Sequence, residues 1–305
     1  MYKILFLLIF FVSFNFKTYG ALIKNIPIGM KSIGMNESSS ALSERTEALN
    51  INPGGLGKLK KKEVSYFHTS YINNISIENI SYVTPLYPSM VKRENNSLMQ
   101  KLRIGINLGY LYYKDINVYD SFGAVEQTVD YNILSLKLGM GVPLSEGNSF
   151  RLYIGVAEKM DKETIDDFKV SSFSTEMGAM AVFVINKASG LYSLLGPQFR
   201  ISGMYNKEEY SIGFGFKFLK RIFVGYDIKN RDGIVTSYLG GEIWLWKHIG
   251  IRAGWSDSSN FAKIGYGLSV ALKKEKNKRL YVEFNSTAES EIDTVYNIGV
   301  KYVFK

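Results

Sequence analysis

Apolar side chains recur at every second position from Val64 almost to the end of the chain, in stretches of about ten residues that end in Gly, Asn, Asp, Ser or Lys. This period of two is typical of β-strands. In one stretch the apolar face carries Ile264, Tyr266, Leu268, Val270 and Leu272, and the opposite face carries Lys263, Gly265, Gly267, Ser269 and Ala271. The first face suits lipid, whereas the second is small or polar.

About fourteen such segments follow one another, an even number as in bacterial outer-membrane barrels. They start near Val64, Ile75, Leu102, Ile133, Phe150, Phe173, Leu194, Tyr210, Ile222, Ser237, Ile249, Phe261, Leu280 and Thr294. Residues 63–305 number 243, which agrees with fourteen strands at roughly 17 residues per strand and connection. Polar insertions at 88–101, 114–130 and 161–170 are predicted to be long loops.

The pattern predicts an all-β fold, a transmembrane antiparallel β-barrel of about 14 strands formed by residues 63–305. A soluble sandwich or a lipocalin-like barrel also alternates, but it places its large apolar residues inside and its polar residues outside. The segments here are longer than the five or six residues usual in soluble sheets, and their second faces are rich in Gly, Ser and Lys. The membrane barrel is therefore the favoured interpretation.

The N-terminus has the order of a secretory signal peptide: Lys3, an apolar run over residues 4–12, and then small residues at Gly20 and Ala21. We expect residues 1–20 to be removed on export to the bacterial outer membrane, with an uncleaved anchor as the alternative. Residues 21–62 lack the period of two and are predicted to form a short N-terminal plug, or hatch, before the first strand.

Composition and charge agree with an exported barrel. The mean hydropathy of −0.04 is what strands with one apolar and one polar face produce, and the absence of cysteine excludes a disulfide framework. Without Lys3 and Lys17 the chain has 35 Lys and Arg against 28 Asp and Glu. These cations are scattered except at residues 58–62, which argues against nucleic-acid binding and favours outer-membrane lipids as partners.

Catalytic and metal-binding motifs are missing, so we expect neither an enzyme nor a cofactor. The paired acids Asp166 and Asp167 are the nearest candidates, but neighbouring strand residues point to opposite faces, and we expect loop acids. Charged residues also punctuate the polar faces: Lys137, Glu176, Lys217, Glu242, Arg252, Lys263, Glu283 and Lys301. Ion pairs between strands are the favoured interpretation, although Glu242, Arg252 and Lys263 are also candidates for contacts with a ligand, the two cations as counter-ions for an acidic headgroup.

Residues 28–35, the pair Ala41 and Leu42, and residues 47–56 resemble the N-terminal signature of PorV/PorQ-type outer-membrane proteins, relatives of the FadL long-chain fatty-acid transporters. Residues 162–168 with 176–179, residues 240–244 with 251–255, and the last segment from Thr294 resemble the same family. The chain departs from the family pattern at Asn36 and Glu37, where the family has Gly and then Gly or Ala. Glu44 and Arg45 replace an acidic pair, which puts in doubt any role of that pair here.

The tetrad Asn52, Pro53, Gly54 and Gly55 predicts a tight turn, in which Asn caps its own backbone, Pro restricts φ and Gly supplies a positive φ. In the FadL family the matching turn belongs to the hatch that fills the lumen. The resemblance therefore implies that this turn shapes a gated passage.

The resemblance implies a FadL-like transporter or channel for hydrophobic or amphipathic small molecules. Two alternatives stay open at this point. One is a PorV-like accessory subunit of a protein secretion system, whose partners would be secreted proteins. The other is a structural surface barrel with no ligand.

Overall fold

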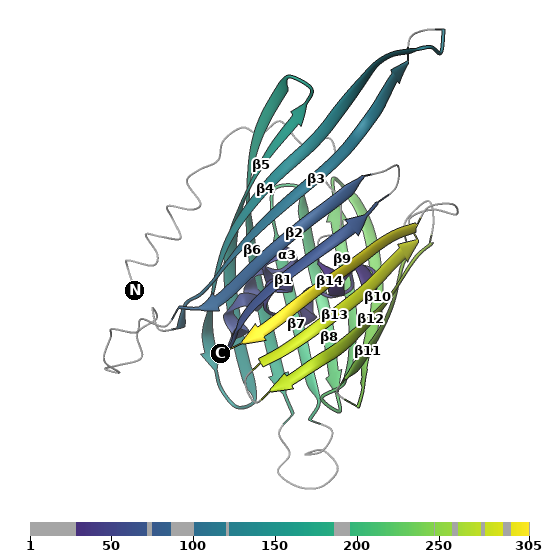
Figure 1. Cartoon of the computed structure of the whole chain (residues 1–305). Helices are drawn as coiled ribbons and strands as arrows, with labels where there is room; N and C mark the ends of the chain where they lie inside the picture. The colour runs from purple at the N-terminus through teal and green to yellow at the C-terminus, as the bar shows by residue number, and fades with distance from the viewer. Residues whose placement is uncertain are drawn as a thin grey trace, which may run out of the picture.

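The structure is a computed structural model. In the part of the chain that it describes, fourteen antiparallel strands close into a barrel around a short inner segment (Figure 1). The described residues are 29–71, 75–86, 101–119, 122–185, 196–246, 248–257, 262–275, 278–288 and 294–304. Each strand pairs with its neighbours in sequence, and β1 closes the barrel against β14, with Lys62 opposite Phe304. The predicted signal peptide lies outside the described residues.

The strands are β1 (Lys62–Ser70), β2 (Ser76–Pro85), β3 (Arg103–Tyr119), β4 (Val125–Glu146), β5 (Phe150–Ile165), β6 (Phe168–Val184), β7 (Gln198–Tyr205), β8 (Glu209–Phe218), β9 (Ile222–Arg231), β10 (Ile234–Leu245), β11 (Ile249–Asp257), β12 (Ala262–Glu275), β13 (Lys278–Ala288) and β14 (Thr294–Phe304). The closed antiparallel barrel and the strand number confirm the predicted fold class.

Alternation of side chains separates an apolar outer surface from a polar inner surface. On β14 the outward residues Tyr296, Ile298 and Val300 are exposed, whereas the inward residues Asn297 and Lys301 are buried. The same division runs along the other spanning strands, as expected for a barrel whose outside meets lipid. Among the described residues, no helix combines the length and the apolarity needed to cross a membrane.

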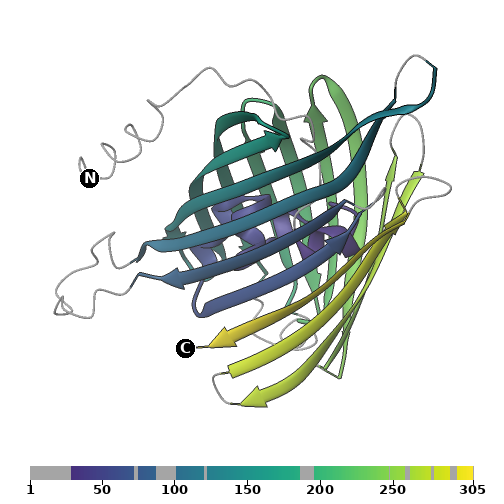
Figure 2. The ribbon, with the colours of Figure 1, turned by 45° about the horizontal axis from the view of Figure 1, so that its top comes forward.

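Residues 29–61 lie inside the barrel and are called the luminal segment below (Figure 2). Its elements are α2 (Met30–Gly34), η1 (Ser40–Leu42), α3 (Thr46–Ile51) and η2 (Pro53–Lys58). Helix α2 contacts β11 to β14, η1 contacts β7 to β9, α3 contacts β1 to β4, and η2 contacts β3 to β7. The segment thus follows the inner wall around almost its whole circumference.

Strands β3 to β6 are longer than their neighbours and project beyond the rest of the barrel as an arm (Figure 1). Strand β2 reaches only as far as Tyr112 of β3, and β7 only as far as Met177 of β6. The prediction of long loops at 114–130 and 161–170 was therefore wrong, because most of these residues continue the two hairpins. Above the lipid both faces of a strand meet water, so the strands lose the alternation by which they are recognised.

The observed strand starts agree with the predicted ones within a few residues, except for β4 and β6, whose first residues lie in the arm. Asp166 and Asp167 form the turn between β5 and β6, and Asp166 adopts a positive φ of 51°. The two acids are therefore turn residues, as the sequence predicts. The insertion predicted at 88–101 lies almost wholly outside the described residues.

Candidate functional site

Glycines that face the lumen form continuous rows where the luminal segment meets the wall. On β8 to β12 they pair directly from strand to strand, in the order Gly215, Gly225, Gly240, Gly254 and Gly265. A second group on β3 to β6 consists of Gly105 opposite Gly139, and of Gly141, Gly155 and Gly178 in register. These two groups are called the glycine rows below.

The luminal segment occupies the space that side chains would fill at the glycine rows, with its backbone at seven of the ten glycines and with leucine side chains at the other three. A Cβ atom would lie 1.9 Å from the Ser38 carbonyl oxygen at Gly225, and 2.1 Å from the Pro53 carbonyl oxygen at Gly155. Both distances are far below van der Waals contact. Only glycine lets the segment approach the wall this closely, and nine strands carry such glycines.

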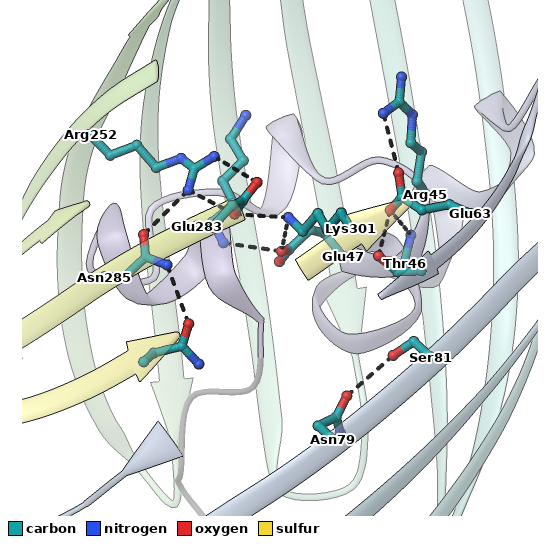
Figure 3. Close-up of polar contacts among 12 residues, drawn as sticks. Arg45, Thr46, Glu47, Glu63, Asn79, Ser81, Arg252, Glu283, Asn285 and Lys301 are labelled. Atoms are coloured by element: carbon teal, nitrogen blue, oxygen red, sulfur yellow. Dashed lines mark hydrogen bonds and ion pairs between the residues drawn. The ribbon is translucent and has the colours of Figure 1, made fainter. Parts of the chain in front are cut away.

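An alternating chain of charges joins the luminal segment to the wall. Figure 3 shows its stretch from Arg252 through Glu283 and Lys301 to Glu47. This chain of charges runs in the order Lys31, Glu242, Arg252, Glu283, Lys301 and Glu47, and is called the ionic ladder below. The links measure 2.9 Å, 3.0 Å, 3.0 Å, 3.2 Å and 2.8 Å between the charged atoms. Its two ends, Lys31 and Glu47, belong to the luminal segment, and the four members between them lie on β10, β11, β13 and β14.

Arg252 is the centre of the ionic ladder, with only 2 % of its side chain exposed. Its guanidinium donates to Glu242, to Glu283 and to the amide oxygen of Asn285. Three cations and three carboxylates leave the ladder with no net charge, which is the condition under which charges can be buried in a lumen. Ion pairs between strands, the favoured interpretation of these residues, are present.

A second anchor holds Glu37 of the luminal segment. Its carboxylate accepts from Lys229 at 2.9 Å and from Arg231, which also pairs with Glu209. Burial by itself would raise the pKa of the Glu37 carboxyl, but the charges of Arg231 and Lys229 outweigh burial and hold that pKa well below its usual value.

The backbone at this anchor is of a kind that suits glycine, the residue type that the PorV/PorQ signature has or allows at these positions. Asn36 and Glu37 both adopt positive φ, at 46° and 62°. Glycine tolerates this conformation and asparagine does so better than most residues, whereas a glutamate there is strained. The ion pairs of Glu37 with Lys229 and Arg231 offset that strain.

Glu44 lies between two cations, Lys58 of η2 and Arg200 of β7, the latter at 2.9 Å. Burial favours the neutral acid, but the two cations outweigh it and lower the pKa of Glu44 well below its usual value. One carboxylate cannot compensate both cations, and burial together with Arg200 lowers the pKa of Lys58 to about 7. The neighbouring Arg45 pairs with Glu63 of β1 at 3.2 Å, so both replaced family positions bind the wall.

The turn at Asn52 begins η2. The side-chain oxygen of Asn52 accepts from the Gly54 amide at 2.9 Å, as the sequence predicts, and its amide group donates to the Ala179 carbonyl of the wall at 3.3 Å. The prediction of a positive φ was wrong, since neither Gly54 nor Gly55 adopts one. Gly54 is needed because a Cβ would lie 2.9 Å from the Cα of Ala179, and Gly55 because a Cβ would lie 2.5 Å from the Ser43 oxygen.

The remaining candidate, Lys263, lies on β12 at a half-buried inward position, and its carbonyl accepts from the Asn36 side chain at 2.9 Å. Lys263 lies nearer the arm side of the luminal segment than Glu242 and Arg252. The three candidates therefore do not share one pocket. Among the described residues, no group of three His, Asp or Glu side chains is placed to hold a metal ion.

Sequence reasoning missed an apolar patch on the inner wall at the base of the arm. Ile77, Leu111, Tyr131 and Ile133 face inward and pack together there, with Ile165 against them. It is called the arm patch below. In the sequence these residues are ordinary members of alternating strands. The pattern does not show that they point inward, so it does not predict the patch.

No family model matches the sequence, and no curated protein matches it either. Solved structures do resemble the fold. The toluene transporter TodX of Pseudomonas putida superposes with a TM-score of 0.59 at 10 % identity, and the toluene transporter TbuX of Ralstonia pickettii with 0.58 at 10 %, each covering 91 % of this chain and 98 % of the other. A FadL homologue of Pseudomonas aeruginosa gives 0.54 at 9 %, with 92 % and 98 % covered. The chain has the fold of these barrels, whereas the narrower PorV/PorQ resemblance stays a prediction.

We expect Gly225→Leu to displace the luminal segment, because the new side chain must occupy the position of the Ser38 carbonyl. Overpacking of this kind costs about 1–3 kcal/mol. The free energy of unfolding in lipid vesicles measures the cost, and single-channel conductance reports any opening. Gly203→Leu is the matched control, since it faces outward and its nearest neighbour would be 3.9 Å away. Equal behaviour of the two variants would contradict the role of the glycine rows.

Arg252→Met removes the centre of the ionic ladder and leaves Glu242 and Glu283 with one cation each. Breaking a buried ion pair costs about 3–5 kcal/mol. Urea titration in vesicles should show this loss. Arg151→Met, which removes an exposed hydrogen bond to Gly147 and an interaction with Tyr153, should change stability by much less than Arg252→Met. A similarly small change in Arg252→Met would show that the ionic ladder adds little to the free energy of unfolding.

Because folding lowers the pKa of Glu37, its ion pairs add stability at neutral pH that is lost as the pH falls below 4.5, the usual value of this carboxyl. The unfolding free energy of the wild type should therefore decrease more steeply below about pH 4.5 than that of Glu37→Gln. Tryptophan fluorescence during denaturant titration at several pH values measures both. The variant Glu126→Gln, at an exposed position, should show the same dependence of the unfolding free energy on pH as the wild type. If the curve of Glu37→Gln against pH runs parallel to that of the wild type, the ion pairs of Glu37 do not add this stability.

Proposed function

We propose that the chain forms a channel for hydrophobic or amphipathic small molecules in the bacterial outer membrane, and that the luminal segment is its plug. The observation that carries the proposal is the seat of this segment. It follows the inner wall, meets the glycine rows at backbone distance and is bound by ion pairs on several sides. A permeant molecule must displace the segment or pass between it and the wall.

The nature of the permeant follows from two further features. The arm patch is a buried apolar cluster on the inner side of the wall at the projecting end of the barrel, and large projections of outer-membrane barrels face the outside. A hydrophobic molecule arriving from outside would meet this patch before the plug. The barrels with the same fold include two toluene transporters, which supports the same class of permeant.

The ligand candidates divide by their place relative to the plug. Arg252 and Glu242 are engaged by the protein's own charges, and their role in the proposed channel is to hold the plug. Lys263 lies on the arm side of the plug, at a half-buried position, and is the residue we assign to contact an acidic headgroup. Asn52 and Pro53 fix the plug against β5 and β6.

A disulfide tests whether the plug must move. The chain has no cysteine, and the hydroxyl oxygens of Ser40 in η1 and Ser202 on β7 lie 2.9 Å apart. Ser40→Cys with Ser202→Cys should form a disulfide after a small adjustment, since an S–S bond is about 2.05 Å long. Uptake of labelled fatty acid or toluene is measured in a host bacterium lacking its own channel of this type.

We expect the wild type to raise uptake above the empty host, and oxidation of the double variant to lower it at least about fivefold, with recovery on reduction. The single variant Ser40→Cys should not respond to oxidant. Absence of uptake by the wild type would refute the channel. Full uptake by the oxidised double variant would refute a moving plug and would show that molecules pass between the plug and the wall.

The accessory role in protein secretion has one structural feature in its favour, the arm, whose hairpin tips carry Phe122 and Phe168 with 94 % and 66 % exposure. Capture of an exported protein that depends on these tips, in a chain that supports no uptake, would favour this role over the channel.

A further inference from the structure

Glu158 on β5 points to the lipid side of the barrel. Along the strand its outward neighbours are Val156 and Met160, and across the sheet it stands opposite Leu138 of β4 and Thr175 of β6. The inward positions beside it are taken by Ala157, which packs on the luminal segment, and by Lys159. A carboxylate therefore lies within the apolar outer surface.

Its surroundings leave Glu158 without a compensating charge. The one hydrogen bond it makes comes from the Thr175 hydroxyl, and no cation in the described part of the chain pairs with it. The inward acids Glu242, Glu283 and Glu176, by contrast, each have a cation within 3.0 Å. An ionisable side chain in contact with lipid is costly unless a partner compensates its charge.

An apolar groove of about 410 Å³ lies directly beside Glu158 on the outer surface. Outward side chains of β2 to β5 line it, namely Tyr82, Thr84, Ile104, Leu138, Met140 and Val156. Two of these, Leu138 and Val156, are the neighbours of Glu158 described above. The volume lies within the range of pockets that hold small molecules. The groove opens to the membrane, so its occupant is a molecule dissolved in lipid.

We infer that Glu158 and this groove form a lipid-facing binding site for an amphipathic amine, whose ammonium pairs with Glu158 and whose hydrocarbon chain lies in the groove. Charge complementarity selects the headgroup. A carboxylate repels an acid, a neutral alcohol leaves its charge uncompensated, and an ammonium both compensates the charge and donates a hydrogen bond. Thr175 holds the carboxylate in place. The site lies outside the lumen and is independent of the proposed channel.

The test uses the full-length protein in phosphatidylcholine nanodiscs and three spin-labelled probes with the same twelve-carbon chain, carrying an amine, a hydroxyl or a carboxylate. Electron paramagnetic resonance measures the fraction of each probe that is immobilised by the protein. We expect the amine to be bound at least about fivefold more strongly than the alcohol, and the carboxylate to be bound least.

Two variants separate the headgroup from the chain. Glu158→Gln should remove the preference for the amine while the alcohol is bound as before. Met140→Trp fills the groove and should weaken binding of both probes with Glu158 intact. Glu126→Gln, an exposed acid of the arm, is the matched control and should behave as the wild type. Electrophoretic mobility with and without heating shows that each variant is folded.

Equal immobilisation of the three probes by the wild type would overturn the inference, as would an unchanged preference in Glu158→Gln or unchanged binding in Met140→Trp. A second copy of the chain is the other occupant to exclude. Since the protein has no cysteine, Glu158→Cys introduces one thiol, and efficient disulfide dimers in the membrane would show that position 158 faces another copy instead of a ligand.

Discussion

Close approach between the luminal segment and the barrel wall is the constraint on which the rest of the structure depends. A barrel of this size leaves a lumen that must be filled by side chains, by water or by another part of the chain. Here residues 29–61 fill it, and much of their closest contact with the wall lies at glycines, which leave no side chain in between. Because the glycines pair from strand to strand, they form two shallow seats on the inner wall, and these accept backbone and leucine side chains of the segment at close range.

Both charges and apolar side chains hold the segment in these seats, the apolar contacts being centred on Leu49 and Leu56. The ionic ladder, the anchor at Glu37 and the cluster at Glu44 each join a charge on the segment to charges on several strands. Their geometry is specific, and ion pairs and hydrogen bonds can be exchanged for water when a segment moves. In the proposed channel these contacts define the closed position of the plug.

The two surfaces of the barrel follow opposite patterns, and each has local exceptions. The inner surface is mostly polar, and the arm patch is an apolar area of it at the projecting end, where a hydrophobic molecule would enter the proposed channel. The outer surface is mostly apolar, and Glu158 is a carboxylate within it that has no cation partner among the described residues and lies beside an apolar groove. In each case a local departure from the pattern, at a cost in solvation, marks a place where the surface meets something other than its usual solvent.

The sequence by itself determined the fold class, the number of strands and the direction of their faces, because a closed barrel imposes a period of two on every spanning strand. It also identified the inward charges and the self-capping Asn52. It did not reveal the arm, since strands in water lose that period. It did not reveal the glycine rows, the order of charges in the ionic ladder or the groove beside Glu158. Those depend on the register between strands and on the path of residues 29–61, so that Gly225 and Gly240 become neighbours only after pairing. Alternation is local and can be read along the chain, whereas register and the filling of the lumen arise from contacts between distant residues, which only the tertiary structure decides.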